Sequence, residues 1–315
     1  MTEPASELRQ IAAVLKREPR WRIICHIKPD GDTLGCGSAL MTAAQLLGKD
    51  AVWGGADPMP PLYRFLPHAA EYEQLNSVPD DGRCLIAVDV STRDRGLSAA
   101  DVRISIDHHK DNEGFAREVN WIVPEAAAVG ELIFELVQQL GCGLTPAIAQ
   151  ALYVSIATDC GWFRFSNTTA NTLRVASELV KAGAVPHEID ELLDYNDSLA
   201  KMRLWGRCLS RAEKAGSRSV ISWVSHDDFR ETGALEADTE GLVNMLTHAA
   251  GTDMTVLVSE TARGLRCSFR SRGSLAANDL AAKWNGGGHR YAAGCTIEAA
   301  LEAGLDMIRK ELERV

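Results

Sequence analysis

Four largely apolar segments in the first half of the chain contain an aspartate or histidine near their carboxyl end or are followed by one, and this pattern constrains the fold more than any other. They are residues 22–27, 84–90, 102–106 and 146–157. The first three are typical of buried strands, and helical patterns separate them, which predicts an α/β layer fold with a mostly parallel sheet. The carboxyl ends of such strands meet at one edge. We therefore expect one cleft to gather the polar residues at these ends, which are His26, Asp30, Asp32, Asp89, Asp107, His108, His109 and Asp159.

The remaining patterns predict two domains. Further helices are expected at 34–48, 126–140, 169–182 and 186–193, and a second α/β block begins near Ser219. We place an N-terminal domain that carries these polar residues at 1–190, a partly helical connector at 191–217, and a smaller C-terminal α/β domain at 218–315. The expected elements of that second domain are strands 220–224, 254–258 and 265–270 and helices 240–248 and 299–312.

Charge and cysteine usage limit the function classes. The net charge of −10 argues against a protein that coats long DNA or RNA and favours a small anionic substrate. The first 20 residues are polar, without an apolar signal region, and no stretch has the length of a membrane span. None of the eight cysteines forms a Cys-x-x-Cys pair, which favours free thiols over zinc sites or disulfides. We expect a cytoplasmic protein with no membrane partner.

Several carboxylates in one cleft need a counter-charge. Any one of these aspartates could simply cap a helix or shape a turn, and a lone histidine is usually structural. Together they would repel one another unless cations were bound. Oxygen and imidazole ligands without cysteine suit Mn²⁺, or alternatively Mg²⁺, better than Zn²⁺. Two such ions would balance four carboxylates and favour phosphate-ester hydrolysis.

The same motifs carry a family resemblance. The triplet Asp107-His108-His109 and the three acidic motifs around it resemble the DHH phosphoesterases, and residues 268–271, 286–289 and 292–294 resemble the DHHA1 domain. Length and layout are most similar to the nanoRNase/pAp-phosphatase branch, the bifunctional oligoribonucleases. The related RecJ-type exonucleases carry an extra nucleic-acid-binding domain. Family II pyrophosphatases lack the Gly-Gly-Gly-His block.

The resemblance implies a role for each matching residue. One metal would take His26, Asp30 and Asp89, and the second would take Asp32, Asp89, His108 and Asp159, so that Asp89 bridges them. His109 would face the substrate phosphate. Asp107 would support the catalytic histidines from behind, where carboxylates orient ligands and fix their tautomers.

The segment 261–290 is predicted to hold the substrate. It contains six Lys or Arg residues against one Asp, beside the run Gly286–Gly288. Glycine backbone N–H groups and an arginine fork suit a phosphate, although an exposed strand face and a flexible loop are the ordinary alternatives. Relatives often carry Asp-Val where residues 276–277 are Ala-Ala. The expected substrate-binding residues, in addition to His109, are Arg270, Ser271, Asn278, Gly287, Gly288 and His289.

These features favour a Mn²⁺-dependent phosphodiesterase that degrades very short oligoribonucleotides to mononucleotides. Nucleotide bisphosphates such as 3′-phosphoadenosine 5′-phosphate are a second expected substrate. Hydrolysis of cyclic or linear dinucleotides is the alternative within the enzymes, and an inactive nucleotide sensor is the alternative outside them. The sequence does not distinguish RNA from DNA as substrate, and it does not give the direction of cutting. It is compatible with a homodimer.

Overall fold

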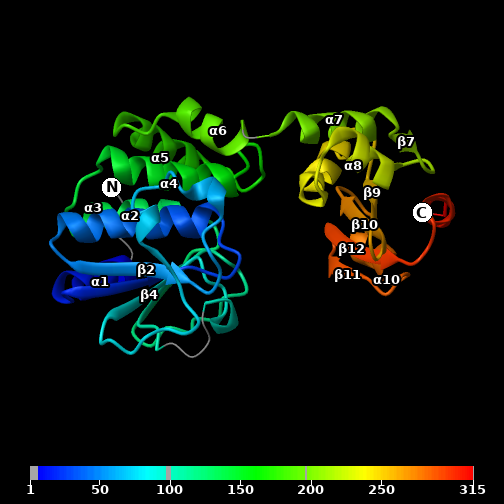
Figure 1. Ribbon diagram of the computed structural model, residues 1–315. Coiled ribbons are helices and arrows are strands. Elements are labelled where there is room, and N and C mark those ends of the chain that lie inside the picture. The colour runs from blue at the N-terminus through cyan, green and yellow to red at the C-terminus, as the bar shows by residue number, and fades with distance from the viewer. Residues whose placement is uncertain (1–5, 97–100, 196, 315) are drawn as a thin grey trace. The chain divides into compact units, whose positions relative to one another are not determined.

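The computed structural model describes residues 6–96, 101–195 and 197–314 and divides the chain into two compact units. The N-terminal unit runs to Asn196 and the C-terminal unit begins at Asp197, and each has its own hydrophobic core (Figure 1). The segment 191–217 is shared between them. Helix α6 (Pro186–Asp194) belongs to the first unit, whereas α7 (Leu199–Ser210) belongs to the second.

A six-stranded sheet of parallel strands forms the centre of the N-terminal unit, as the sequence predicts. Its spatial order is β3-β2-β1-β4-β5-β6, so the direction of winding reverses between β1 and β4. Ligands of open α/β sheets bind outside the carboxyl ends of the strands at such a reversal. The strands are β1 (Arg20–Ile24), β2 (Asp50–Gly55), β3 (Tyr72–Gln74), β4 (Cys84–Val88), β5 (Ile104–Asp107) and β6 (Val119–Ile122).

The helix that follows β1 is buried along most of its length. Helix α2 packs against β1 and β2 on one side and against α4 on the other (Figure 1). Close packing requires small residues, because a Cβ atom on Gly35 would lie 2.4 Å from the carbonyl oxygen of Ala151. The α-helices of this unit, besides α6, are α1 (Ser6–Arg17), α2 (Gly31–Leu46), α3 (Val129–Leu140), α4 (Pro146–Asp159) and α5 (Ala170–Lys181).

The C-terminal unit has a mixed six-stranded sheet in the order β11-β12-β10-β9-β8-β7. Only β8 and β9 pair in parallel among its described strands. The strands are β7 (Glu213–Lys214), β8 (Ser219–Val224), β9 (Met254–Thr261), β10 (Gly264–Ser271), β11 (Gly287–His289) and β12 (Ala292–Ile297). The helices, besides α7, are α8 (His226–Thr232), α9 (Leu242–Leu246), α10 (Ala277–Ala282) and α11 (Leu301–Leu312).

Short 3₁₀ turns complete the described secondary structure. They are η1 (Pro61–Tyr63), η2 (Ala69–Glu71), η3 (Arg93–Arg95) and η4 (Glu236–Thr239). Within residues 6–96, 101–195 and 197–314, no helix combines the length and the apolar character that crossing a membrane requires.

Candidate active site

Three neighbouring strands bring the predicted residues to one edge of the sheet. His26 follows β1, Asp89 follows β4, and β5 ends at Asp107, directly before His108 and His109. Strand β4 pairs in parallel with both β1 and β5, with Val88 beside Ile106. The strand ends are therefore level, and the side chains that follow them lie close together.

Asp89 has an uncommon backbone conformation that aims its carboxylate into this site. Its φ of 57° lies in the left-handed region, which aspartate tolerates better than most residues. Its backbone N–H donates to the carbonyl oxygen of Ile106 at 3.0 Å, which fixes the turn. The carboxylate is buried, with Oδ2 3.3 Å from His26 Nε2 and Oδ1 3.7 Å from His108 Nε2. One carboxylate thus faces two imidazoles.

The first ligand group consists of His26, Asp30 and Asp89. His26 Nδ1 lies 2.7 Å from the carbonyl oxygen of Ile27, so Nδ1 carries the proton in the neutral ring and Nε2 is free to bind a cation. Nε2 is 3.4 Å from Asp30 Oδ1. The same Asp30 oxygen caps α2 by accepting the backbone N–H groups of Asp32 and Thr33. Asp30 therefore caps α2 and also lies where it can bind a metal ion.

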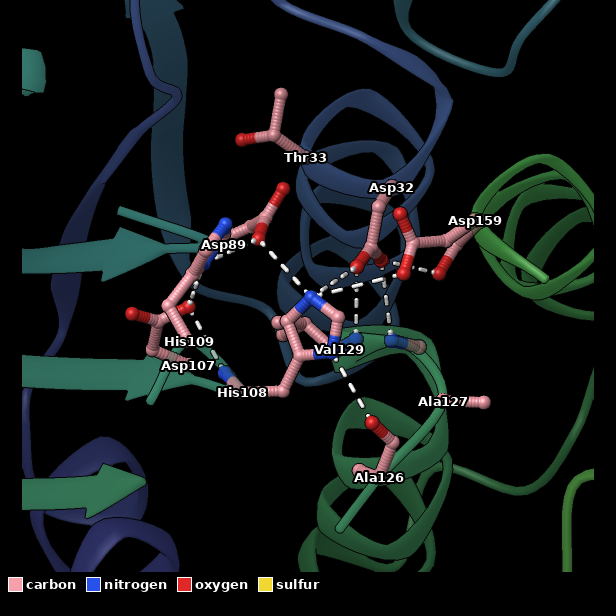
Figure 2. A network of polar contacts seen from close by, with 12 residues as sticks. Asp32, Thr33, Asp89, Asp107, His108, His109, Ala126, Ala127, Val129 and Asp159 are labelled. Atoms are coloured by element: carbon pink, nitrogen blue, oxygen red, sulfur yellow. Dashed lines mark hydrogen bonds and ion pairs between the residues drawn. The ribbon is translucent and has the colours of Figure 1, made fainter. Parts of the chain in front are cut away.

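The second group surrounds His108 (Figure 2). Its Nδ1 lies 3.0 Å from the carbonyl oxygen of Ala126, which again leaves Nε2 free. That Nε2 is 3.8 Å from Asp32 Oδ2 and 3.6 Å from Asp159 Oδ2. Asp30 and Asp32 therefore serve different groups, although only Gly31 separates them. Gly31 is needed because a Cβ atom there would lie 2.3 Å from Thr158 Oγ1.

Asp32 is also a structural anchor. Its Oδ2 accepts the N–H of Val129 at 2.8 Å and its Oδ1 accepts the N–H of Gly130 at 3.2 Å, so the amino end of α3 points at this carboxylate. Ser155 donates its hydroxyl to Oδ1 at 2.5 Å. We did not predict Ser155, although it stands one helical turn before Asp159, and that spacing places both residues on one face of α4.

Asp107 lies behind the two histidines. Its side chain is fully buried, and its Oδ1 accepts His109 Nδ1 at 2.8 Å and the backbone N–H of His108 at 2.8 Å. Its Oδ2 accepts the side-chain amide of Asn112 at 2.6 Å. His109 keeps 35% of its side-chain surface exposed, and its Nε2 makes no hydrogen bond to the described residues, so this nitrogen is available to a ligand.

The crowding of charges shifts several pKa values in the metal-free site. Burial and the charge of Asp32 raise the pKa of Asp89 and of Asp159 to about 7 each. Burial disfavours a charged His26, but hydrogen bonds and charges from Asp30 and Asp89 outweigh it and raise its pKa to about 10. The hydrogen bond to Asp107 raises the pKa of His109 to about 9. The site thus holds protons that a cation would displace.

The donor set fits divalent cations. It consists of carboxylate oxygens and imidazole nitrogens without sulfur, the set that suits hard and intermediate divalent ions. Asp89 Oδ1 is buried and accepts no hydrogen bond from the described residues. A buried acceptor without a donor is costly, and a cation at this position would satisfy it.

We predict that Mn²⁺ raises the melting temperature more at pH 8.5 than at pH 6. Raised folded-state pKa values of Asp89 and Asp159 lower the stability of the metal-free protein as pH rises from about 4 to 7. The raised values of His26 and His109 continue the loss up to pH 9–10, because their stabilisation is complete only below the unfolded pKa of about 6.5. Calorimetry with and without Mn²⁺ measures the difference, and an equal shift at both pH values would contradict it.

A separate groove of about 1030 Å³ lies in the C-terminal unit. Arg270 on β10 and the run Gly286–Gly288 both line it, and β12 lies between β10 and β11 in the sheet. Gly287 and Gly288 pair with Gly294 and Ala293, so the run forms an edge strand and not a free loop. Arg270 donates to Asn244 Oδ1 at 3.1 Å and has no carboxylate partner among the described residues, while burial lowers its pKa.

The other residues that we predicted to bind substrate in the C-terminal domain are not among those that line this groove. Ser271 is buried, and its hydroxyl donates to the carbonyl oxygen of Leu275. Asn278 lies on α10 with its Oδ1 buried and unpaired within the described part of the chain, and neither residue lines the groove. His289 ends β11 and is exposed. Groove residues that we did not predict include Arg266, Ser268, Lys283, Trp284 and Asn285.

Comparisons with known proteins agree with this architecture. The family model for the N-terminal domain of the DHH family matches residues 20–156, and the DHHA1 domain model matches residues 220–315. The chain is 35% identical to the bifunctional oligoribonuclease and PAP phosphatase NrnA of Thermus thermophilus, over 98% of this chain and 95% of that protein. It is 28% identical to the protein of the same name in Bacillus subtilis, over 91% and 92% of the two chains.

A solved structure shows the same fold across both units. The crystal structure of an exopolyphosphatase-related protein from Bacteroides fragilis superposes with a TM-score of 0.84 at 22% identity, covering 98% of this chain and 96% of the other. The domain matches and the near full-length identity to the Thermus protein lead to one conclusion. The chain belongs to the DHH family of phosphoesterases, and it has the layout of a DHH domain followed by a DHHA1 domain.

Proposed function

We propose that this protein is a two-metal phosphoesterase that hydrolyses very short oligoribonucleotides to mononucleotides and converts 3′-phosphoadenosine 5′-phosphate to AMP, with Mn²⁺ as the working ion. One observation carries the proposal. The two oxygens of Asp89 face separate ligand groups, His26 with Asp30 on one side and His108 on the other. A carboxylate shared in this way suits a pair of divalent ions.

The protein side chains have distinct tasks in this reaction. His26, Asp30 and Asp89 would hold one ion, and Asp32, His108 and Asp159 would hold the other. Asp89, whose Oδ1 is 3.7 Å from His108 Nε2, would also serve the second ion. When bound, two such ions activate a water and stabilise the charge on the attacking and leaving oxygens. His109, held by Asp107 through Nδ1, presents Nε2 to the substrate phosphate. In the metal-free site the hydrogen bond to Asp107 raises the pKa of His109 to about 9, and the protonated imidazole can donate its Nε2–H to a phosphate oxygen.

Several features favour a short substrate. The groove volume of about 1030 Å³ is at the upper end for cavities that hold small ligands, which suits a terminal nucleotide. The net charge of −10 gives no general affinity for long polyanions. The Thermus and Bacillus relatives are named for action on oligoribonucleotides and PAP. In our proposal Arg270, Gly287, Gly288 and His289 hold that nucleotide.

One assay tests the proposal. Purified protein with Mn²⁺ is given an RNA dinucleotide, a pentanucleotide, a 24-mer, a cyclic dinucleotide and 3′-phosphoadenosine 5′-phosphate. We expect fast release of mononucleotide from the dinucleotide and the pentanucleotide, slow release from the 24-mer, and AMP from the bisphosphate. Preference for the cyclic dinucleotide would favour the alternative enzyme. Tight binding without turnover of any substrate would favour a nucleotide sensor.

We predict that Arg270→Ala mainly raises the KM for an RNA dinucleotide. Arg270 belongs to the C-terminal groove and lacks an acidic partner among the described residues, so its loss removes substrate binding and leaves the metal-binding groups intact. A charged hydrogen bond contributes about 1.5–3 kcal/mol, or roughly 10- to 150-fold in KM. Arg230→Ala, an exposed arginine on α8 that does not line the groove, is the matched control. A fall in kcat alone would place Arg270 in the chemistry.

A further inference from the structure

A buried asparagine outside the predicted site uses every polar group of its side chain. Asn112 is 9% exposed. Its Nδ2 donates to Asp107 Oδ2 at 2.6 Å and to the carbonyl oxygen of Val90 at 3.1 Å, while its Oδ1 accepts the N–H of Gly114 at 2.9 Å. A flipped amide would place Oδ1 against two acceptors and Nδ2 against a donor. The orientation is therefore fixed, and no other residue of this size offers two donors and one acceptor.

These bonds connect the two strand ends that carry the chemistry. Val90 follows Asp89 at the end of β4, and Asp107 ends β5. Asn112 joins them through one amide nitrogen. It also occupies Asp107 Oδ2, which leaves Oδ1 for the imidazole of His109 and the backbone of His108.

His109 has a second carboxylate within reach. Its Nδ1 lies 2.8 Å from Asp107 Oδ1 but also 3.4 Å from Asp89 Oδ1. The Asp89 oxygen accepts no hydrogen bond from the described residues. If His109 turned to Asp89, it would occupy the atom that a cation needs, and Nε2 would leave the position from which it can meet the substrate.

We propose that Asn112 is a positioning residue that holds Asp107 in place, so that His109 stays on Asp107 and Asp89 Oδ1 stays free for a divalent cation. The expected kinetic effect rests on the proposed hydrolysis. The expected effects on His109 and on cation binding do not, so the two ideas can fail separately.

The test replaces the amide without changing its shape. Asn112→Leu removes all its hydrogen bonds, and Asn112→Asp keeps the outline but lacks the N–H groups. Asn120→Leu is the control, because the Asn120 side chain bonds to the backbone of Ala116 in the same segment and, among the described residues, has no hydrogen bond to Asp107. NMR of ¹⁵N-histidine-labelled, metal-free protein follows the His109 Nδ1–H proton, assigned by its absence in His109→Gln.

We expect both Asn112 variants to lose or shift the NMR signal of the His109 Nδ1–H proton. We also expect both variants to bind Mn²⁺ more weakly when the affinity is measured by calorimetry. Their kcat should be lower by about 10- to 100-fold, the usual effect of removing a group that supports a metal site. The control should match the wild type in all three. Unchanged signal and Mn²⁺ affinity in Asn112→Leu would overturn the proposal, as would equal losses in Asn120→Leu.

A measurement on the wild type covers the case in which the variants do not fold. A crystal structure of the wild-type protein with Mn²⁺ should show His109 Nδ1 on Asp107 and an ion on Asp89 Oδ1. An imidazole of His109 bound to Asp89 or to the ion would overturn the proposal. If that structure agrees but no dinucleotide is cleaved, only the proposed function fails.

Discussion

Asp89→Asn should lower kcat on an RNA dinucleotide by more than about 100-fold, because groups that merely orient metal ligands already cost about 10- to 100-fold when they are removed. Asp89 faces both His26 and His108, so both proposed ions would lose a charged ligand. Asparagine tolerates the left-handed φ of 57° at this position. The effect should therefore come from lost charge and not from a broken turn.

The same variant should stabilise the metal-free protein at pH 8.5. The pKa of Asp89 is raised to about 7, so its ionisation above that pH costs folding free energy that an amide does not. Thermal melts without metal should show a higher melting temperature for Asp89→Asn than for the wild type, and Mn²⁺ should add less. Asp94→Asn, an exposed carboxylate in the following 3₁₀ turn, is the control for charge alone. Near-normal kcat in Asp89→Asn would show that Asp89 does not bridge two ions.

The sheet and the position of the site could be predicted because parallel strands impose both. The largely apolar segments 84–90 and 102–106 predict buried strands, and the carboxyl ends of neighbouring parallel strands lie at one edge of the sheet. His26, Asp89 and His108 follow such ends and do meet. Strands β3 and β6, at the two edges of the sheet, were not predicted because each is short and only partly buried. Helix α1 was not predicted, although Leu8, Ile11, Ala12 and Leu15 have the spacing of a helix with one buried face.

Residues that support the site are harder to predict, since their contacts come from tertiary packing. Asn112 reaches Asp107 across a turn, and Ser155 reaches Asp32 from a different helix. No sequence period connects these pairs. The glycine run 286–288 suggested an anion-binding loop, whereas pairing with β12 makes it an edge strand. That pairing depends on the strand at 292–297, which we did not predict from the sequence.

Asp32 and Asp159 face the same imidazole, yet their removal should change the stability of the metal-free protein in opposite directions at pH 8.5. The Asp159 carboxylate accepts no hydrogen bond from the described residues, and burial with the charge of Asp32 raises its pKa to about 7. Asp159→Ala therefore removes a repulsive charge and should raise the melting temperature. Asp32→Ala instead leaves the N–H groups of Val129 and Gly130 and the hydroxyl of Ser155 without an acceptor.

Each buried donor that loses its partner costs about 1–3 kcal/mol, so Asp32→Ala should lower the melting temperature even though it also removes a charge. Both variants should lose more than about 100-fold in kcat as ligand losses. Ser155→Ala, which removes one donor to Asp32 and no proposed ligand, should fall between them in stability and lose about 10- to 100-fold in activity, less than either ligand variant. If Asp32→Ala were as stable as Asp159→Ala, its carboxylate would not anchor α3. If the two variants lose the same activity but differ in melting temperature, Asp32 both binds metal and supports the fold, whereas Asp159 only binds metal.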